Sequence, residues 1–252
     1  MIKFFRKIRY DLMEKNETGK YLKYAIGEIV LVVIGILIAL QINNWNENQK
    51  TKRQEIKLWN QLNSDLKSNF YEVEETIDYT EKSITSTKII LEYLDQTKAV
   101  DDRLKSAFEI INMSNVFNSA NTTYKFIENQ GINILRNDSL RQRITEMYEL
   151  DFHNIKYRDE INWDLITNDL RPLLDVSLKS SKMVSTEFKY GAILDLNTPI
   201  DMKILSKDEQ FKNVIVRIQN FLLIRSMHQQ KTRASLEKLI ADIDTEIKTK
   251  AL

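Results

Sequence analysis

The stretch KYAIGEIVLVVIGILIALQINNW, residues 23–45, decides how the rest of the chain is interpreted. Residues 29–40 form an unbroken apolar run of 12, with Glu28 and Gln41 as the polar residues at its edges. A transmembrane helix needs about 20 mainly apolar residues. The run is short but sufficient, because aromatic side chains, which favour membrane interfaces, flank it at Tyr21, Tyr24 and Trp45.

Two other interpretations of this run are a cleaved signal peptide and the buried core helix of a soluble domain. A signal would carry a leading segment of 24 residues, which is long, and the triplet Ala39-Leu40-Gln41 is not a signal-peptidase site. Lipoprotein processing needs a cysteine, and the chain has none. We therefore favour an uncleaved transmembrane helix over residues 25–45.

Basic residues predict the orientation of this helix. The first 24 residues contain seven Lys and Arg, whereas residues 43–62 contain four. The excess predicts a single-pass inner-membrane protein with residues 1–24 in the cytoplasm and residues 46–252 in the periplasm. The segment MIKFFRKIRYDL is also amphipathic. It either lies on the inner leaflet or is a solvated basic anchor that only sets the topology.

Glu28 shares one helical face with Val32, Gly35 and Ala39. Gly35 and Ala39 form a small-xxx-small pair, which allows close approach of two membrane helices. Glu28 therefore has three interpretations: it reaches the cytoplasmic headgroups, contacts a partner helix, or carries a proton or ion.

The composition predicts long helices and excludes several functions. The chain has 252 residues but five Gly and two Pro, and neither occurs in the 95 residues from 36 to 130. Turn-forming residues are thus scarce. A net charge of +1 gives no overall field for nucleic acid. The absence of cysteine excludes disulfides, thiol catalysis and Cys-ligated zinc.

A heptad pattern follows the predicted span. One position of the heptad is occupied by Ile56, Asn63, Phe70, Ile77, Ile84 and Leu91, and the other by Trp59, Leu66, Val73, Thr80, Thr87 and Leu94. Nine of these twelve residues are apolar, which predicts one helix from about 44 to 93. The stripe is either an intermolecular coiled coil or the seam of an intramolecular bundle, and later helices of matching length favour the bundle.

The later sequence predicts further helices and therefore an all-α fold, an elongated antiparallel bundle with one very long first helix. Short helices are expected at 102–112 and at 122–129, the latter ending at Gly131. Capping boxes at Ser139/Gln142 and Ser206/Glu209 predict the starts of two long helices. The first is expected to end at Leu170, before Pro172. Within the irregular residues 173–205, FKYGAILDLNTPIDMKI is either a loop or a small hairpin.

Two blocks resemble a known family. They are IKFFRKIRYDLMEKN with GKYLKYAIGEIVLVVIGILIALQINNWNE, and TTYKFIENQGINILRNDSLRQRITEMY. Both are similar to a family of uncharacterised single-span membrane proteins from Bacteroidota. The resemblance implies an inner-membrane anchor and an extracytoplasmic helical domain. It supplies no catalytic residue.

Candidate functional residues are few. His153 lacks the repeated Glu-x-x-His pattern of di-metal bundles and is interpreted as a surface histidine. Arg225 and His228 interrupt an apolar stripe, so they either line a ligand pocket or form a polar layer with an acidic neighbour. The turn that includes Asn129, Gly131 and Asn133 either fixes how two helices meet or is a partner-binding tip.

These observations lead to three hypotheses for the function. The first is a membrane-anchored interaction or scaffold protein of the cell envelope, in contact with membrane lipid and with another envelope protein or a second copy. The second is a periplasmic sensor or small-ligand receptor that acts through a partner. The third, an enzyme, has no support from a phosphate-binding loop, a nucleophile elbow or a metalloprotease motif. We expect no cofactor, no metal and no nucleic-acid partner.

Overall fold

The computed structural model describes residues 18–177, 183–184, 193–194 and 202–251. The amphipathic stretch at residues 1–12 lies outside this part of the chain, as does most of the irregular segment 178–201. The chain divides into two compact units, Met1–Glu55 and Ile56–Leu252.

The first unit contains the beginning of helix α2 (Thr18–Gln96). An 18-residue window of this helix has a mean hydropathy of 2.6, and none of the window is buried. Among the described residues, α2 is the one helix that is long and apolar enough to cross a membrane. Since the apolar side chains from Ile29 to Ile42 are exposed, the run is not a core helix of either unit.

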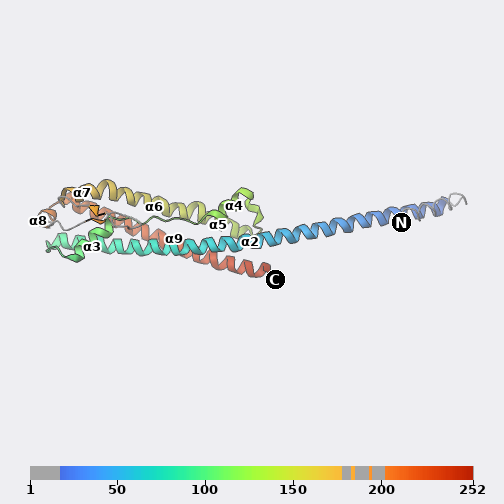
Figure 1. Ribbon diagram of the computed structural model, residues 1–252, viewed down its shortest axis with the longest axis horizontal. Helices are drawn as coiled ribbons and strands as arrows, with labels where there is room; N and C mark the ends of the chain where they lie inside the picture. The colour runs from blue at the N-terminus through green and yellow to red at the C-terminus, as the bar shows by residue number, and fades with distance from the viewer. Residues whose placement is uncertain (1–17, 178–182, 185–192, 195–201, 252) are drawn as a thin grey trace. The chain divides into compact units, whose positions relative to one another are not determined.

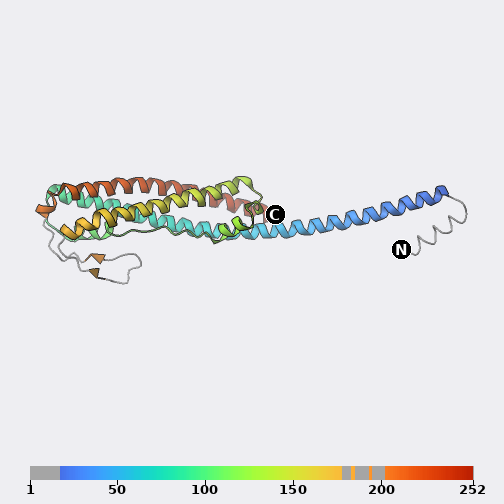
Figure 2. The ribbon, with the colours of Figure 1, turned by 90° about the horizontal axis from the view of Figure 1, so that it is seen from above.

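The second unit is a bundle of three long helical rods (Figures 1 and 2). The first rod is the later part of α2, and the third is α9 (Glu209–Ala251). The middle rod consists of α5 (Asp138–Glu146), η2 (Met147–Asp151), α6 (Phe152–Asp164), η3 (Leu165–Leu170) and α7 (Arg171–Ser177). The predicted all-α fold with a very long first helix is confirmed.

Short elements connect the rods. They are α3 (Asp102–Ile111), α4 (Thr122–Gln130), η1 (Ile132–Ile134) and α8 (Met202–Leu205). Both predicted short helices are confirmed to within a residue. Strand β1 (Met183–Val184) pairs antiparallel with β2 (Ile193–Leu194), so β2 lies in the stretch predicted to be a loop or hairpin, whereas its partner precedes that stretch.

Side-chain pairs define how the rods run. On the α2 side of α9, Asp95 pairs with Lys212, Glu74 with Arg233 and Lys67 with Asp244. On the other side, Asp169 pairs with Arg217, Asp159 with Arg225 and Arg143 with Asp242. In both series the residue number falls on one helix as it rises on the other. Rod α9 is therefore antiparallel to both neighbours, while α2 and the middle rod run in the same direction (Figure 1).

Three details of the predicted helix ends are wrong. The cap of α5 is Asn137, whose side chain accepts a hydrogen bond from the Leu140 amide, so Ser139 is not the cap. Asp208, in place of Ser206, accepts from the Phe211 amide at the start of α9. Ser, Asn and Asp are all good caps, and the backbone decides which one is used. Pro172 does not end the rod, since the helix continues directly from η3 through α7 to Ser177.

The core of the bundle consists of two apolar clusters. The Phe108 cluster joins the end of α2, α3 and the first half of α9, and the Trp59 cluster joins the first half of the bundle part of α2, α4, α5 and the end of α9. All six residues of the heptad series that begins at Trp59 are buried. The heptad stripe is thus the seam of an intramolecular bundle, as predicted, and its Thr80 lies between Val73 of the Trp59 cluster and Ile84 of the Phe108 cluster.

Candidate functional site: a buried polar layer

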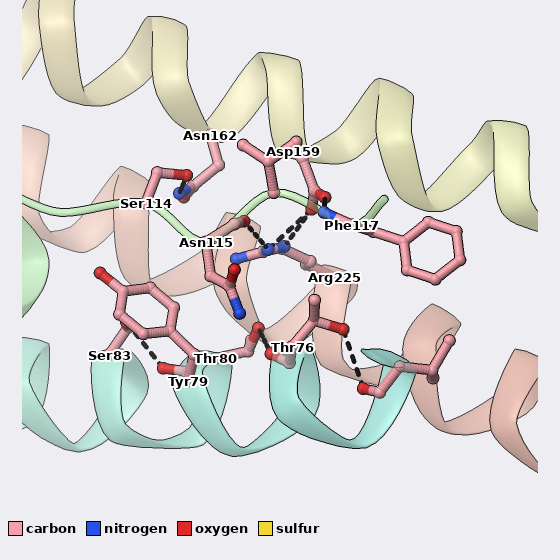
Figure 3. Close-up of polar contacts among 12 residues, drawn as sticks. Thr76, Tyr79, Thr80, Ser83, Ser114, Asn115, Phe117, Asp159, Asn162 and Arg225 are labelled. Atoms are coloured by element: carbon pink, nitrogen blue, oxygen red, sulfur yellow. Dashed lines mark hydrogen bonds and ion pairs between the residues drawn. The ribbon is translucent and has the colours of Figure 1, made fainter. Parts of the chain in front are cut away.

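Polar side chains fill the core between the Phe108 and Trp59 clusters. We call these buried residues the polar layer: Thr76, Thr80, Ser83, Thr87, Ser114, Asp159, Asn162, Arg225 and Gln229. They come from α2, α6, α9 and the extended segment 112–121 that passes along the bundle (Figure 3). On α2, Thr76, Thr80 and Ser83 lie between Val73 of the Trp59 cluster and Ile84 of the Phe108 cluster. On α9, the layer lies between Leu222 of the Phe108 cluster and Leu236 of the Trp59 cluster.

An ion pair lies at the centre of the layer. The Nε and Nη2 atoms of Arg225 donate to Oδ1 of Asp159 at 3.0 and 2.7 Å, and neither side chain is exposed. Nη2 also donates to the Asn115 carbonyl at 3.0 Å, and the Phe117 amide donates to Oδ2 of Asp159 at 2.7 Å (Figure 3). The pair therefore attaches α6, α9 and the extended segment to one another.

Burial has a clear electrostatic effect in this layer. It raises the pKa of Asp159, while the Arg225 guanidinium and the Phe117 amide oppose the shift by stabilising the carboxylate. Burial likewise raises the pKa of Tyr79 to about 12. The Tyr79 hydroxyl donates to the Ile110 carbonyl at 2.7 Å, so it connects α2 to α3 as a neutral phenol.

The α2 side of the layer consists of small hydroxyl residues whose hydrogen bonds are made to the backbone of α2 itself. Thr76, Thr80 and Ser83 each donate to a backbone carbonyl three or four residues earlier. Their bonds stay within the helix, so they do not hold α2 to the other rods. A direct side-chain bond from α9 to the layer residue Thr87 on α2 runs from Gln219 Nε2 to Thr87 Oγ1 at 3.3 Å.

Several buried atoms of the layer have no hydrogen-bond partner among the described residues. They are Nη1 of Arg225, Oδ1 of Asn162, and both Nε2 and Oε1 of Gln229. Leaving such atoms unpaired costs about 1–3 kcal/mol each. Burial of these atoms opposes folding, and the layer lies between two apolar clusters.

The structure separates Arg225 from His228. Arg225 enters the layer, whereas His228 is exposed on the outer edge of α9 and its Nε2 lies 2.9 Å from Nη2 of Arg158 on α6. Three residues turn a helix by about 300°, which leaves the two side chains about 60° apart, so His228 lies at the edge of the buried face that carries Arg225. Burial, and then the positive charges of Arg158 and Lys231, lower the pKa of His228.

The turn at residues 129–133 is attached to α9. Asn129, Gly131 and Asn133 are exposed, and Gly131 has a φ of 96°, which favours glycine. Just after the turn, Asn137 donates to Glu246 at 2.8 Å, and Leu135 is buried in the Trp59 cluster. The turn is thus fixed from one side, and the partner-binding interpretation of its tip stays a prediction.

The predicted face of the span is exposed at three of its four positions. Val32, Gly35 and Ala39 are exposed, Glu28 is half-buried, and the space beside Gly35 is open. These four residues can be reached by a second helix, and their role in such a contact stays a prediction.

No group of three His, Asp or Glu side chains within the described ranges could hold a metal ion. A pocket of about 330 Å³ lies beside His153. It is lined by Phe117, Asn118, Ser119, Asn121, Tyr148, Phe152, His153 and Lys156. A second pocket of about 580 Å³ lies between the end of the middle rod and the start of α9. Neither pocket contains a member of the polar layer.

Comparison with known protein families matches residues 28–220 to a family of unknown function, DUF6090. The chain belongs to the DUF6090 family. The DUF6090 match begins at Glu28, within the apolar run, and ends in α9 five residues before Arg225. It includes Asp159 and the turn at Gly131. Searches of curated proteins and of solved structures return no match.

Sequence reasoning missed Asp159, Asn162 and the segment 112–121. A signal for the first two exists, since Phe152, Ile155, Asp159, Asn162 and Ile166 follow a helical spacing and are all buried. Asp159 therefore replaces an apolar residue on the inward face of α6. The segment 112–121 has no such periodicity, and its role depends on contacts with residues distant in sequence.

Proposed function

We propose that this DUF6090 protein is a membrane-anchored helical interaction protein of the cell envelope. In this proposal residues 25–45 form a single-pass inner-membrane anchor, with residues 1–24 in the cytoplasm and the bundle in the periplasm. The bundle docks to another envelope protein or to a second copy. The resemblance to single-span proteins from Bacteroidota agrees with this assignment.

One observation carries the proposal: an 18-residue window of mean hydropathy 2.6 contains no buried residue in a chain whose bundle already buries its own core. Contiguous exposed apolar surface of this size needs a lipid or protein neighbour. The hydrogen bonds of the buried ion pair are made within the bundle, among α6, α9 and segment 112–121, which is typical of a structural role.

The test is to crosslink native membranes, purify the tagged full-length protein under denaturing conditions and identify the crosslinked species. A stoichiometric second protein or a ladder of this chain alone supports the proposal, and the two results distinguish the two kinds of partner. A monomer without adducts, at a crosslinker dose that links known envelope complexes, overturns it.

A receptor for a small polar ligand is the second candidate. The pocket beside His153 supports it, because its volume of about 330 Å³ falls in the range of small-molecule sites and Asn118, Ser119 and Lys156 offer polar contacts. A receptor should unfold at a higher temperature when its ligand is present. A set of small polar solutes, tested on the protein and on His153→Ala, would show stabilisation that the variant loses.

A further inference from the structure

The outer face of α9 carries an apolar surface that the bundle does not use. Val216, Leu223, Ile224 and Met227 are 36, 45, 47 and 71% exposed. Their spacing places them on one side of the helix, opposite the buried Arg225. We call these four residues the α9 outer strip. An apolar strip with helical spacing fits the apolar face of another helix.

The charge around this strip is unusual. From Gln210 to Leu236 the sequence of α9 contains no Asp or Glu. Most of its basic side chains in this stretch pair with carboxylates on the other rods: Lys212 with Asp95, Arg217 with Asp169, Arg225 with Asp159 and Arg233 with Glu74. Lys231 is the basic residue of this stretch that makes no ion pair with a carboxylate of the described residues.

Lys231 belongs to a cluster of three basic side chains beside Met227. Within the described residues, Arg158 on α6 has one hydrogen-bond partner, the neutral imidazole of His228. The buried Nε atom of Arg158 has no partner there. Arg158 and Lys231 both lower the pKa of His228. On η2, Asp151 is influenced by Lys231, but burial raises its pKa and it forms no ion pair within the described chain. Within the part of the chain that the structure describes, the cluster therefore forms no ion pair with a carboxylate.

We propose that the α9 outer strip and the cluster of Arg158, His228 and Lys231 bind an amphipathic helix of another protein that has carboxylates beside its apolar face. The inference deepens the proposed function and rests on it. Apolar side chains of the partner cover Leu223, Ile224 and Met227, and a carboxylate lies against Arg158 and Lys231. A second copy docked through the same face would instead bring like charges together.

The experiment places a photoreactive amino acid at Met227 of the full chain and crosslinks it in native membranes. A matched control carries the same photoreactive residue at Glu75, which is exposed on α2. We expect an adduct with one other protein from Met227 and none from Glu75. Mass spectrometry should place the crosslink in a helical segment that has Asp or Glu beside its apolar positions.

Charge variants make the test specific. Lys231→Glu should reduce the adduct at least tenfold, whereas Lys248→Glu, an exposed lysine farther along α9, should leave it within twofold. When the partner's carboxylate residue is replaced by lysine, the adduct with the Lys231→Glu variant should return. Met227 is largely exposed, and Leu223 serves as a second photoreactive position if the first variant is unstable by circular dichroism.

Several outcomes would overturn the inference. They are an adduct made of this chain alone, an adduct with lipid alone, one that persists in Lys231→Glu, or none from either position. If a partner co-purifies in the whole-membrane experiment but does not crosslink to Met227 or Leu223, this surface is wrong and the proposed function stands. If no partner is found by either route, the proposed function fails as well.

Discussion

Arg225 on α9 and Asp159 on α6 form a fully buried ion pair through two hydrogen bonds to one carboxylate oxygen. Their backbones are 66 residues apart in sequence. The pair also holds the Asn115 carbonyl and the Phe117 amide, so it orients the extended segment as well as the two rods. Its removal should therefore affect three parts of the bundle at once.

Replacing one member of the pair should destabilise the protein strongly. Asp159→Leu leaves an unpaired buried guanidinium, and we expect it to lower the free energy of unfolding by about 3–5 kcal/mol. The double variant Asp159→Leu/Arg225→Met should recover most of this loss. Urea unfolding of the full chain in detergent, followed by tryptophan fluorescence, measures both.

The exposed pair of Asp78 and Lys82 on α2 provides the control. Its side chains are 64 and 61% exposed, so Asp78→Leu should change the free energy of unfolding by no more than about 1 kcal/mol. Equal losses at Asp78 and Asp159 would contradict the central role of the buried pair.

Replacing Gln229 should not destabilise the protein, in contrast to replacing Asp159. Both atoms of its buried amide lack a partner among the described residues, so Gln229→Met should leave the free energy of unfolding unchanged or raise it by about 1–3 kcal/mol. Gln219→Met removes the bond to Thr87 and should lower it by about 1 kcal/mol. Marked destabilisation by Gln229→Met in the same urea assay would show that this amide is bonded in solution.

Gly131→Ala tests the turn. The position has a φ of 96°, and no atom lies within 4 Å of an added Cβ, so the penalty is conformational only. We expect a loss of about 1–2 kcal/mol in the free energy of unfolding. Asn133→Ala, in the same exposed turn, should stay within about 0.5 kcal/mol. If Gly131→Ala were equally mild, the left-handed backbone would not be required.

The stability should depend on pH through His228. The pKa of His228 is lower in the folded protein than its ordinary value of 6.5. Between the folded-state pKa and 6.5, the unfolded chain therefore binds more protons than the folded chain. The free energy of unfolding from this group therefore rises with pH across that window and falls as the pH drops below 6.5. Urea unfolding from pH 5 to 8 should show a smaller change in His228→Gln.

Nuclear magnetic resonance provides a direct check of the same group. The imidazole carbon signal that disappears in His228→Gln should titrate with a midpoint below 6.5. A midpoint above this value would mean that the two neighbouring cations do not act on His228 as the structure indicates.

Cysteine labelling tests the orientation of the span. The chain has no cysteine, and Ser64 is exposed on α2. In cells with a permeabilised outer membrane, a maleimide that cannot cross the inner membrane should label Ser64→Cys and should not label Asn16→Cys. The reverse pattern would place the bundle in the cytoplasm.

Features that depend on residues close together in the sequence could be predicted, and features that depend on residues far apart in the sequence could not. The helix at 18–96 follows from local properties, since the stretch lacks breakers after Gly35 and has a sustained apolar stripe. Helix caps were placed less well, because Asn137 and Ser139 can both cap and only the backbone path distinguishes them. The layer residue Arg225 was identified as an interruption of an apolar stripe.

Asp159, the partner of Arg225, could not be identified from such a local pattern. Asp159 meets Arg225 only when α6 and α9 pack in one register, and no local pattern gives that register. The sequence also grouped His228 with Arg225, whereas the helix directs one side chain outward and the other inward. The long-range contacts of segment 112–121 depend equally on the finished packing.

The two π-helical turns in the middle rod determine where this chain can lose a single residue. In each turn the hydrogen bond runs over five residues, as from the Phe152 amide to the Met147 carbonyl and from the Arg171 amide to the Ile166 carbonyl. Each turn therefore accommodates one residue more than an α-helix would. Deleting Leu150 or Thr167 would convert a turn to ordinary α geometry and keep Asp159 facing Arg225. A single residue can thus be removed from either turn of this chain without rotating the ion pair out of the core.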